Sequence, residues 1–518
     1  MKKFTYILIT LFVASTSLYA QGQMDALRFS QSDMFGTARA MGMGGAFGAL
    51  GGDQTGVSIN PAGIAIYRSS EVVGTFQFMS NAAHVGNETA RRGSFNMPNF
   101  GFVGFFPTRN HVMPFINVGL TYNQSQTFNR RVSAVGAPQH SLMNYIADRS
   151  FGLDEVSLQF RDNYDPFRSQ PWLSVLAYNS WLINPAQNGH WLPFDTQGAQ
   201  IENRIRMRER GFIDNFGFSL GTTLGDVLSL GASLSITSIS YRVDSEYHEN
   251  FSTGRGRGSY VLENMLTTDG SGVAGRFGLI FRPIHQLRFG VAYHTPTRFA
   301  LTETFSASME DAMLHFVTDP GYQPGRTDSQ IFSNDYDLRT PDRWVFSAAA
   351  IVGDLIASVD YEITDFSQMR LLPAAGQRLP SDWFDADNQF IQEDFRSAST
   401  LRVGLDYRIT PQLSARVGYV WQQNPNNESF INNGNPWVAG SNTIFVIDGD
   451  ANIFTAGIGY RFNRHFFMDF AIAYRTQTNQ LFGFPNILFE DGAIAVNSSP
   501  FEMRNNSFRG MVTLGHRF

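Results

Sequence analysis

The stretch LRVGLDYRITPQLSARVGYVW, residues 401–421, decides the fold class of this 518-residue chain. On each side of the polar turn at Thr410–Pro411, apolar or aromatic side chains alternate with polar or small ones. A period of two indicates β-strands with one apolar face, and two such runs joined by a turn indicate an antiparallel hairpin. The same alternation recurs in residues 286–305, 354–366 and 445–462, which indicates an all-β chain.

Such strands could form a soluble sandwich or a membrane barrel. The polar faces carry Gly, Ser and Arg, which suits a lumen better than the Lys and Glu of a solvent-facing sheet. Tyr, Phe and Trp gather at the strand ends, as in an aromatic girdle, and short turns alternate with long polar loops. These three features favour the barrel.

We therefore expect a transmembrane antiparallel up-and-down β-barrel of about 14 strands, with twelve and sixteen as alternatives. The expected strands are residues 70–80, 95–107, 113–131, 201–222, 227–247, 258–282, 286–305, 333–352, 354–366, 396–409, 412–424, 445–462, 466–478 and 500–518. Long outer loops are expected at 81–94, 132–200, 248–257, 306–332, 367–395, 425–444 and 479–499, the largest being 132–200.

Both ends of the chain fit an outer-membrane protein. Residues 1–20 carry Lys2 and Lys3, an apolar stretch and a small residue at Ala20, which predicts a signal peptide cleaved near Ala20. The last strand ends on Phe518, which we expect to be read by the barrel assembly machinery. The expected location is therefore the outer membrane of a Gram-negative cell.

Composition excludes several classes of protein. The chain has no Cys, a net charge of −6 and no run of basic residues, which argues against disulfide frameworks, Cys-ligated zinc and nucleic-acid binding. No HExxH motif or His–carboxylate cluster is present. We therefore expect neither an enzyme nor a metal or cofactor, and no nucleic-acid partner.

Residues 21–69 lack the alternation and carry eight of the glycines between positions 42 and 63. The segment is too rich in Gly for a stable free helix and too short for a domain with its own core. We therefore expect three regions: a signal peptide at 1–20, a hatch packed inside the lumen at 21–69, and the barrel at 70–518.

At this point the sequence resembles the FadL/TodX family of outer-membrane transporters for long-chain fatty acids and other hydrophobic compounds. The resemblance rests on the run from Ala38 to Phe47, on Asp53 and on Asn60-Pro61-Ala62-Gly63, with a weaker likeness around residues 340–366. It implies a 14-stranded barrel with an N-terminal hatch. It also implies a kink in the third strand that opens a lateral gap, for which Pro114 and Gly119 are candidates.

Three groups of candidate functional residues follow. The hatch motif comprises Asn60, Pro61, Ala62, Gly63, Arg39 and Asp53. The candidate lumen and hatch ion pairs involve Arg288, Arg402, Arg408, Arg416, Arg461, Asp360, Glu362, Asp406 and Asp469; they either stiffen the wall and hold the hatch or meet a ligand carboxylate. The candidate outer capture site comprises Trp172, Leu176, Trp181, Trp191 and Phe194, and a loop packed on itself as a lid is the alternative.

The sequence thus predicts passive transport of hydrophobic molecules, most simply long-chain fatty acids or similar compounds. The expected steps are capture at the outer loop, entry into a lumen pocket and rearrangement of the hatch. A general or solute-specific porin and a hemin-binding receptor are the alternatives. The expected partners are a hydrophobic ligand and outer-membrane lipid, and we expect a monomer.

Overall fold

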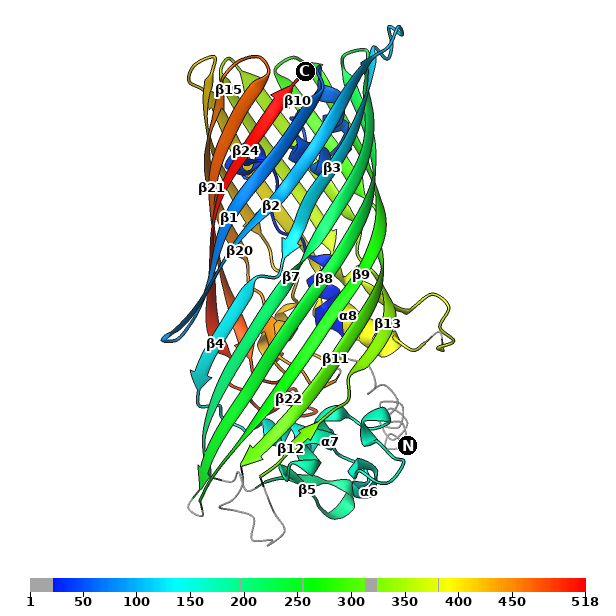
Figure 1. The fold of residues 1–518 in the computed structure, drawn as a ribbon, viewed down its shortest axis with the longest axis vertical. Coiled ribbons are helices and arrows are strands. Elements are labelled where there is room, and N and C mark those ends of the chain that lie inside the picture. The colour runs from blue at the N-terminus through cyan, green and yellow to red at the C-terminus, as the bar shows by residue number, and fades with distance from the viewer. Residues whose placement is uncertain (1–21, 195–197, 254–255, 313–323, 381, 439) are drawn as a thin grey trace.

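The computed structural model describes residues 22–194, 198–253, 256–312, 324–380, 382–438 and 440–518, so the predicted signal peptide lies outside the described residues. The described chain forms a closed antiparallel β-barrel with fourteen strand positions, as expected (Figure 1). The wall strands are β1 (Glu71–Val85), β2 (Glu88–Pro107), β3 (Phe115–Thr127) with β4 (Arg130–Gly136), β7 (Gln200–Leu224), β8 (Leu228–Thr253), β9 (Gly256–Ile284), β10 (Leu287–His294) with β11 (Arg298–Ala312), β14 (Arg343–Val352) with β13 (Phe332–Arg339), β15 (Leu355–Asp365), β17 (Ser397–Arg408), β18 (Leu413–Gln422), β20 (Ala451–Arg461), β21 (Phe466–Phe482) and β24 (Phe501–Arg517).

The first and last strands close the barrel. β1 pairs with β24 over its whole length, from Glu71 opposite Arg517 to Val85 opposite Met503. Phe518 follows directly and hydrogen-bonds through its backbone to Ser70. No strand edge in the described wall between β24 and β1 is therefore left open, as a lipid environment requires.

The apolar faces of the strands point outward and the polar faces point into the lumen. On β17, Val403, Leu405 and Tyr407 are exposed on the outer face, whereas Gly404 and Asp406 are buried inside. The predicted alternation therefore corresponds to a lipid-facing belt around a polar interior. Among the described residues, no helix is both long and apolar enough to cross a membrane.

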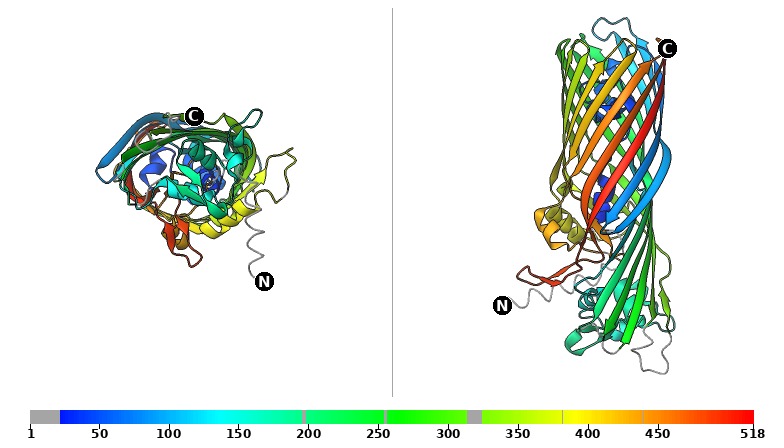
Figure 2. Two further views of the ribbon diagram at one scale, coloured as in Figure 1. Left: turned by 90° about the horizontal axis from the view of Figure 1, so that it is seen from below. Right: turned by 90° about the vertical axis from the view of Figure 1, so that its left-hand side faces the viewer.

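Short turns join the strands at the end of the barrel that holds the C-terminus, and longer segments lie at the opposite end (Figure 1). The N-terminal segment lies inside the lumen as α2 (Gln23–Ser30), α3 (Ala38–Gly42), α4 (Gln54–Ile59) and the 3₁₀ helix η1 (Pro61–Ile66). Figure 2 shows this segment from the open end and from the side, enclosed by the strands. We call residues 22–69 the hatch.

Several expected outer loops are strand. The predicted loop 81–94 is the tip of a hairpin, because β1 runs to Val85 and β2 begins at Glu88. β8 and β9 likewise extend through most of 248–257, and β4 occupies the start of 132–200. Both faces of these extensions lie beyond the apolar belt, so the hydrophobic alternation that marks a membrane strand is absent there.

Two expected strands are broken at a proline. Residues 286–305 divide into β10 and β11 at Pro296, and residues 333–352 divide into β13 and β14 at Pro341. Proline has no backbone N–H to donate to a neighbouring strand. Each break falls where the partner strand changes: β10 pairs with β14, whereas β11 pairs with β13. The wall therefore bends at this height.

The remaining outer segments contain short elements. Residues 137–199 hold α5 (Leu142–Arg149), α6 (Glu155–Leu158), η2 (Pro166–Arg168), α7 (Trp172–Asn179), β5 (Ile183–Pro185), η3 (Gln187–Gly189) and β6 (Trp191–Pro193). The others hold β12 (Arg326–Asp328), η4 (Phe366–Gln368), β16 (Arg370–Pro373), α8 (Asp385–Asp394), α9 (Glu428–Asn433), β19 (Phe445–Ile447), β22 (Ile487–Leu488) and β23 (Ile494–Val496). We call residues 137–194 the helical cap.

Candidate functional site

Polar side chains cap each of the three helices at the inner end of the hatch. Thr37, Asp53 and Asn60 precede α3, α4 and η1, and each accepts a hydrogen bond from a backbone amide two or three residues later. The Thr37 hydroxyl also donates to the Asp53 carboxylate at 2.8 Å. The caps satisfy free N–H groups and tie neighbouring helices together, so a segment with low helix propensity holds one shape.

Asn60 links the hatch to the barrel wall. Its Oδ1 caps η1, while its Nδ2 donates to the carbonyl of Gly48 at 2.8 Å and to the carbonyl of Leu279 on β9 at 3.1 Å. The side chain is buried, so each of these bonds forms away from bulk water. Pro61, Ala62 and Gly63 continue directly into η1.

Arg39 and Asp53 lie on the side of the hatch that faces the short turns. Arg39 donates to the carbonyl of Gly52 at 3.1 Å, and its guanidinium lies 5.3 Å from the Phe47 ring centroid. Both charged residues line a polar cavity of about 280 Å³ together with the turn residues Asp354 and Pro411. We call this space the turn-side cavity.

Glycines in the wall make room for the hatch backbone. A Cβ at Gly278 would overlap the Asn60 amide oxygen, and one at Gly231 would overlap the carbonyl of Pro61. Similar overlaps with the hatch would arise at Gly101, Gly119, Gly221, Gly290, Gly404 and Gly418. The hatch backbone therefore packs directly against these lumen-facing glycines of the wall.

Two of the predicted lumen charges hold the hatch directly. The Asp360 carboxylate accepts from the backbone amide of Gly48 at 2.9 Å, and Arg288 donates to the carbonyl of Leu50 at 2.6 Å. Arg416 is buried in the wall and pairs with Asp406 at 3.0 Å and Asp469 at 2.5 Å.

The other predicted charges lie apart from that group. Arg402 pairs with Glu362 at 2.6 Å, and Arg343, which sequence reasoning did not select, pairs with the same carboxylate at 3.1 Å. Arg408 lies at the rim, 3.7 Å from Asp354, with more than half of its side chain exposed. Arg461 lines the turn-side cavity and makes no ion pair with any described residue.

A second cavity of about 280 Å³ lies on the other side of the hatch, in the middle of the barrel. This central cavity shares no lining residue with the turn-side cavity in the described part of the chain, so the hatch separates the two. Its volume is just below the range of roughly 300–1,000 Å³ typical of ligand pockets. Sequence reasoning did not identify this cavity.

The charged lining of the central cavity has an excess of positive charge. Asp33 of the hatch pairs with Arg475 at 3.0 Å and also with Arg509. Six interior arginines line the cavity with four carboxylates: Arg28, Arg130, Arg343, Arg402, Arg475 and Arg509 with Asp33, Glu209, Glu362 and Asp448. Arg28 also pairs with Asp25, and Arg131 borders the cavity at the wall break while its side chain is exposed on the outer face. The cavity thus favours an anion.

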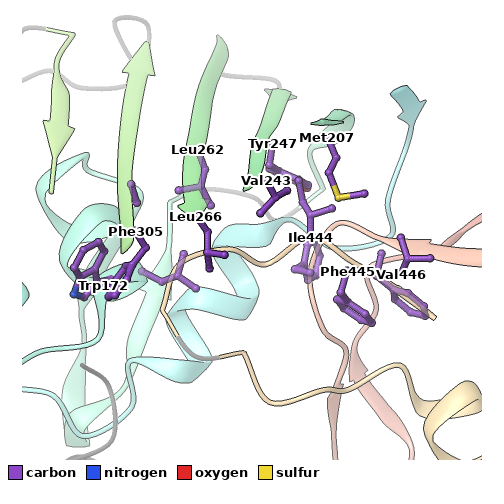
Figure 3. Packing of buried hydrophobic residues seen from close by; sticks show 14 of the residues in the cluster. Trp172, Met207, Val243, Tyr247, Leu262, Leu266, Phe305, Ile444, Phe445 and Val446 are labelled. Carbon is purple, nitrogen blue, oxygen red and sulfur yellow. The ribbon is translucent and has the colours of Figure 1, made fainter. Parts of the chain in front are cut away.

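One wall of the same cavity is apolar. Leu27, Phe128, Val243, Ile444 and Phe445 line it and belong to the large hydrophobic cluster of the outer half of the barrel. Figure 3 shows the segment from Ile444 to Val446 beside Val243 and Met207 in this cluster. The cavity therefore joins a cationic face to an apolar one.

The barrel wall is interrupted beside this cavity. β2 pairs with β3 only between Pro107 and Asn99, and residues 88–98 of β2 pair with β1 alone. Side chains bridge the break, including Asn81 to the carbonyl of Asn129 at 2.8 Å and Arg92 to the carbonyl of Glu209 at 2.9 Å. The break lies beyond Asn123 of β3, not at Pro114 or Gly119, which precede that point.

The predicted outer capture residues mostly form the core of the helical cap. Trp172, Leu176 and Trp191 are buried, Phe194 is partly buried, and Trp181 is 43% exposed. In Figure 3, Trp172 lies beside Phe305 of β11, with ring centroids 4.6 Å apart. Most of these side chains are therefore buried, as the alternative of a loop packed on itself as a lid would have them.

The start of the hatch contacts the outer helix α8. The Gln23 amide donates to the Asp394 carboxylate at 2.6 Å. Burial raises the pKa of Asp394 from its ordinary value of 3.8 to about 7, although the Gln23 hydrogen bond acts in the opposite direction. Burial therefore favours the protonated form, so packing of Asp394 against the start of the hatch gains stability as pH falls from about 7 toward 4 and loses it as pH rises. The Gln23 hydrogen bond itself favours the ionised carboxylate.

The chain has no Cys, so Met24→Cys introduces a single thiol at the start of the hatch. We predict that its rate of labelling by maleimide rises more between pH 6 and pH 8 than the rate for the same cysteine in an Asp394→Asn background. The ratio of the two labelling rates removes the pH dependence of the thiol itself. A several-fold rise in this ratio is expected, since one pKa unit corresponds to about a tenfold change in the equilibrium. A constant ratio would contradict the predicted link.

No group of three or more His, Asp or Glu side chains that could hold a metal ion occurs within the described ranges. The sequence predicted neither a metal nor a cofactor.

The fold resembles solved structures of outer-membrane transporters. The crystal structure of a Pseudomonas aeruginosa FadL homologue aligns with 94% of this chain and 99% of its own, at 15% identity and a TM-score of 0.51. The Ralstonia pickettii toluene transporter TbuX aligns with 93% and 98%, at 13% identity and a TM-score of 0.50. At these identities the likeness concerns the fold.

A sequence relative and a family profile complete the comparison. A 47 kDa outer membrane protein of Pasteurella multocida is 24% identical over 211 residues, which span 40% of this chain and 44% of the relative. The profile of the outer membrane protein transport protein family (OMPP1/FadL/TodX) matches residues 213–488, more than half of the chain. This chain therefore belongs to the OMPP1/FadL/TodX family of outer membrane transport proteins and has the fold of an outer-membrane β-barrel.

Proposed function

We propose that the cargo is an amphiphile with a long apolar chain and an anionic head group, of the long-chain fatty acid type, and that it moves passively through the central cavity. The observation that carries this proposal is the excess of arginine on one face of a cavity whose other face is apolar. A neutral hydrocarbon such as toluene, the cargo in the name of TbuX, would leave the cationic face unused.

Two arginines have free donors for the head group. Nη1 of Arg402 and Nε of Arg509 are buried and make no hydrogen bond to any described residue. A buried unsatisfied donor of a charged group is costly, and guanidinium groups bind carboxylates in paired hydrogen bonds. Both residues line the central cavity, so a carboxylate head group bound there is our candidate partner for these donors.

The apolar wall supplies the binding energy for the chain of the ligand. Each buried CH₂ group contributes about 0.8 kcal/mol, so affinity should grow with chain length rather than with polar recognition. Exposed apolar residues of the helical cap are our candidates for first contact with the ligand: Phe151, Phe160, Trp181 and Leu192.

We propose that the ligand leaves through the break between β2 and β4. Met79 and Asn81 line the central cavity on one side of the break, and residues 126–131 line it on the other. Only side-chain hydrogen bonds need to separate there, whereas the axial route is filled by fully buried hatch residues such as Met41 and Phe47. A displacement of the hatch would accompany this opening.

The test is the double variant Arg402→Gln/Arg509→Gln, with oleate and the neutral oleyl alcohol as ligands. We expect oleate affinity to fall by roughly 10–100-fold, because hydrogen bonds to charged groups are worth about 1.5–3 kcal/mol. Affinity for oleyl alcohol should change little. Binding to purified protein can be followed by displacement of a fluorescent fatty acid.

In the double variant, each carboxylate that loses one arginine keeps a second one. Glu362 keeps Arg343, and Asp33 keeps Arg475. Arg408→Gln at the rim is the matched control and should leave both affinities unchanged. An equal loss for both ligands, or no loss for oleate, would contradict the anionic head group.

A further inference from the structure

We infer that the outer faces of β4, β7 and β8, just beyond the apolar belt, form a docking surface for phosphate-bearing lipid head groups of the outer leaflet. Figure 1 shows these three strands side by side. The surface consists of outward-facing arginines: Arg131 on β4, Arg204, Arg206, Arg208 and Arg210 on β7, and Arg242 on β8. We call it the arginine surface.

Its height in the membrane follows from β7 itself. The outer face of β7 carries Leu220, Phe218, Phe216 and Phe212, each at least 40% exposed, with Asp214 between the last two, and then continues into Arg210 and Arg208. At about 3.3 Å per residue, Arg208 and Arg210 lie only some 7–13 Å along the strand from Phe212. They therefore lie where lipid head groups meet the acyl chains.

Strand pairing places like charges next to each other on this surface. Arg131 lies opposite Arg208 across the β4–β7 ladder, and Arg210 lies opposite Arg242 across the β7–β8 ladder. Like charges directly opposite each other destabilise a sheet. An anion between the two charges stabilises such an arrangement. Asp244 already does so for Arg210 and Arg242, whereas Arg131 and Arg208 share no carboxylate among the described residues.

The acidic residues of the same faces do not neutralise the arginines. Asp244 is shared between Arg210 at 3.2 Å and Arg242 at 2.6 Å, and Glu246 pairs with Arg206. Glu202 lies further out along β7. Arg131, Arg204 and Arg208 make no ion pair with any residue that the structure describes.

A lipid fits this surface better than a soluble anion or a protein. The surface is continuous with the belt that acyl chains cover, so a head group at the arginines keeps its chains on Phe212 and Phe216. It also borders the wall break, because Arg131 lines the central cavity and Arg92 of β2 bridges to β7. A bound head group would therefore lie beside the proposed exit. This inference does not depend on which ligand leaves there.

The experiment compares Arg131→Gln/Arg208→Gln with the charge-matched control Arg161→Gln/Arg168→Gln in the helical cap. Each protein is placed in phosphatidylcholine nanodiscs containing lipid A with both phosphates or fully dephosphorylated lipid A. Retained lipid is measured by native mass spectrometry after the protein is transferred to detergent. Resistance of the unheated barrel to unfolding in SDS reports that each variant is assembled.

We expect wild type and the control to retain diphosphorylated lipid A, and the surface variant to bind it about thirtyfold more weakly, since each arginine near an anionic membrane surface contributes about a factor of five. Dephosphorylated lipid A should bind equally weakly to all three. Equal retention by the surface variant, or retention independent of the phosphates, would overturn the inference. Full displacement by millimolar inorganic phosphate would also overturn it, because the site would then recognise a free anion.

Discussion

One added methyl group at Gly278 should open the closed lumen to ions. The Cβ of Gly278→Ala would overlap the Asn60 amide oxygen and lie 2.9 Å from the backbone nitrogen of Ala62, so the hatch must move away from β9. Overpacking of a well-filled interior typically costs about 1–3 kcal/mol. We expect the hatch to shift and the variant to conduct ions in planar bilayers where the wild type conducts little.

Gly510→Ala is the matched control, because it also places a methyl group on a wall strand but meets no atom within 4 Å. It should remain as closed as the wild type. The double variant Gly231→Ala/Gly278→Ala should conduct more than either single variant, since both glycines border the Asn60–Ala62 segment. If all variants stay closed, the hatch does not rest on these glycines. A wild type that conducts as a porin would contradict the hatch itself.

Replacing Asn60, Pro61 and Ala62 together by glycine should slow oleate uptake into intact cells by about tenfold while leaving barrel assembly intact. Asn60 joins the Gly48 loop, which Asp360 also holds, to Leu279 of the wall. Loss of its buried hydrogen bonds costs about 1–3 kcal/mol each, and three glycines add backbone freedom. A displacement at one end of the hatch would then no longer move the other end.

Uptake of labelled oleate is the measurement, with the amount of heat-modifiable barrel as the reference for assembly. Ser58→Ala serves as the control, because Ser58 lies two residues before Asn60 and its hydroxyl donates to the carbonyl of Thr55 within the hatch. Normal uptake by the triple variant would remove the proposed role of the motif. Slower uptake together with poor assembly would instead assign the motif to folding.

The sequence predicted the wall more fully than the site. A hydrophobic period of two needs only local information, so the strands around Leu405 and Ile458 could be predicted with their lipid-facing sides. The strands beyond the belt could not, because the hairpin tip near Gly86 carries polar residues on both faces. Pairing there depends on the neighbouring strand and not on hydrophobic alternation.

The central cavity was missed because its charged partners come from distant parts of the chain. Asp33 lies 442 residues from Arg475 and 476 residues from Arg509, and no spacing rule joins such residues. The choice between a capture site and a packed lid for the aromatic residues of the helical cap was left open for a related reason. The sequence identifies Trp172 as an apolar residue, but its burial depends on the extension of β11, which brings Phe305 against it.

The enclosed hatch has a consequence for the order of assembly. The wall seals when β1 meets β24, a contact between residues as far apart as Glu71 and Arg517, and the hatch precedes β1 in the chain. A Cβ on Gly44 of the hatch would lie 3.2 Å from backbone atoms of Tyr419 and Val403, so the hatch backbone packs closely against the wall. We infer that the hatch is inside before the seam closes and that the last strands pair around it.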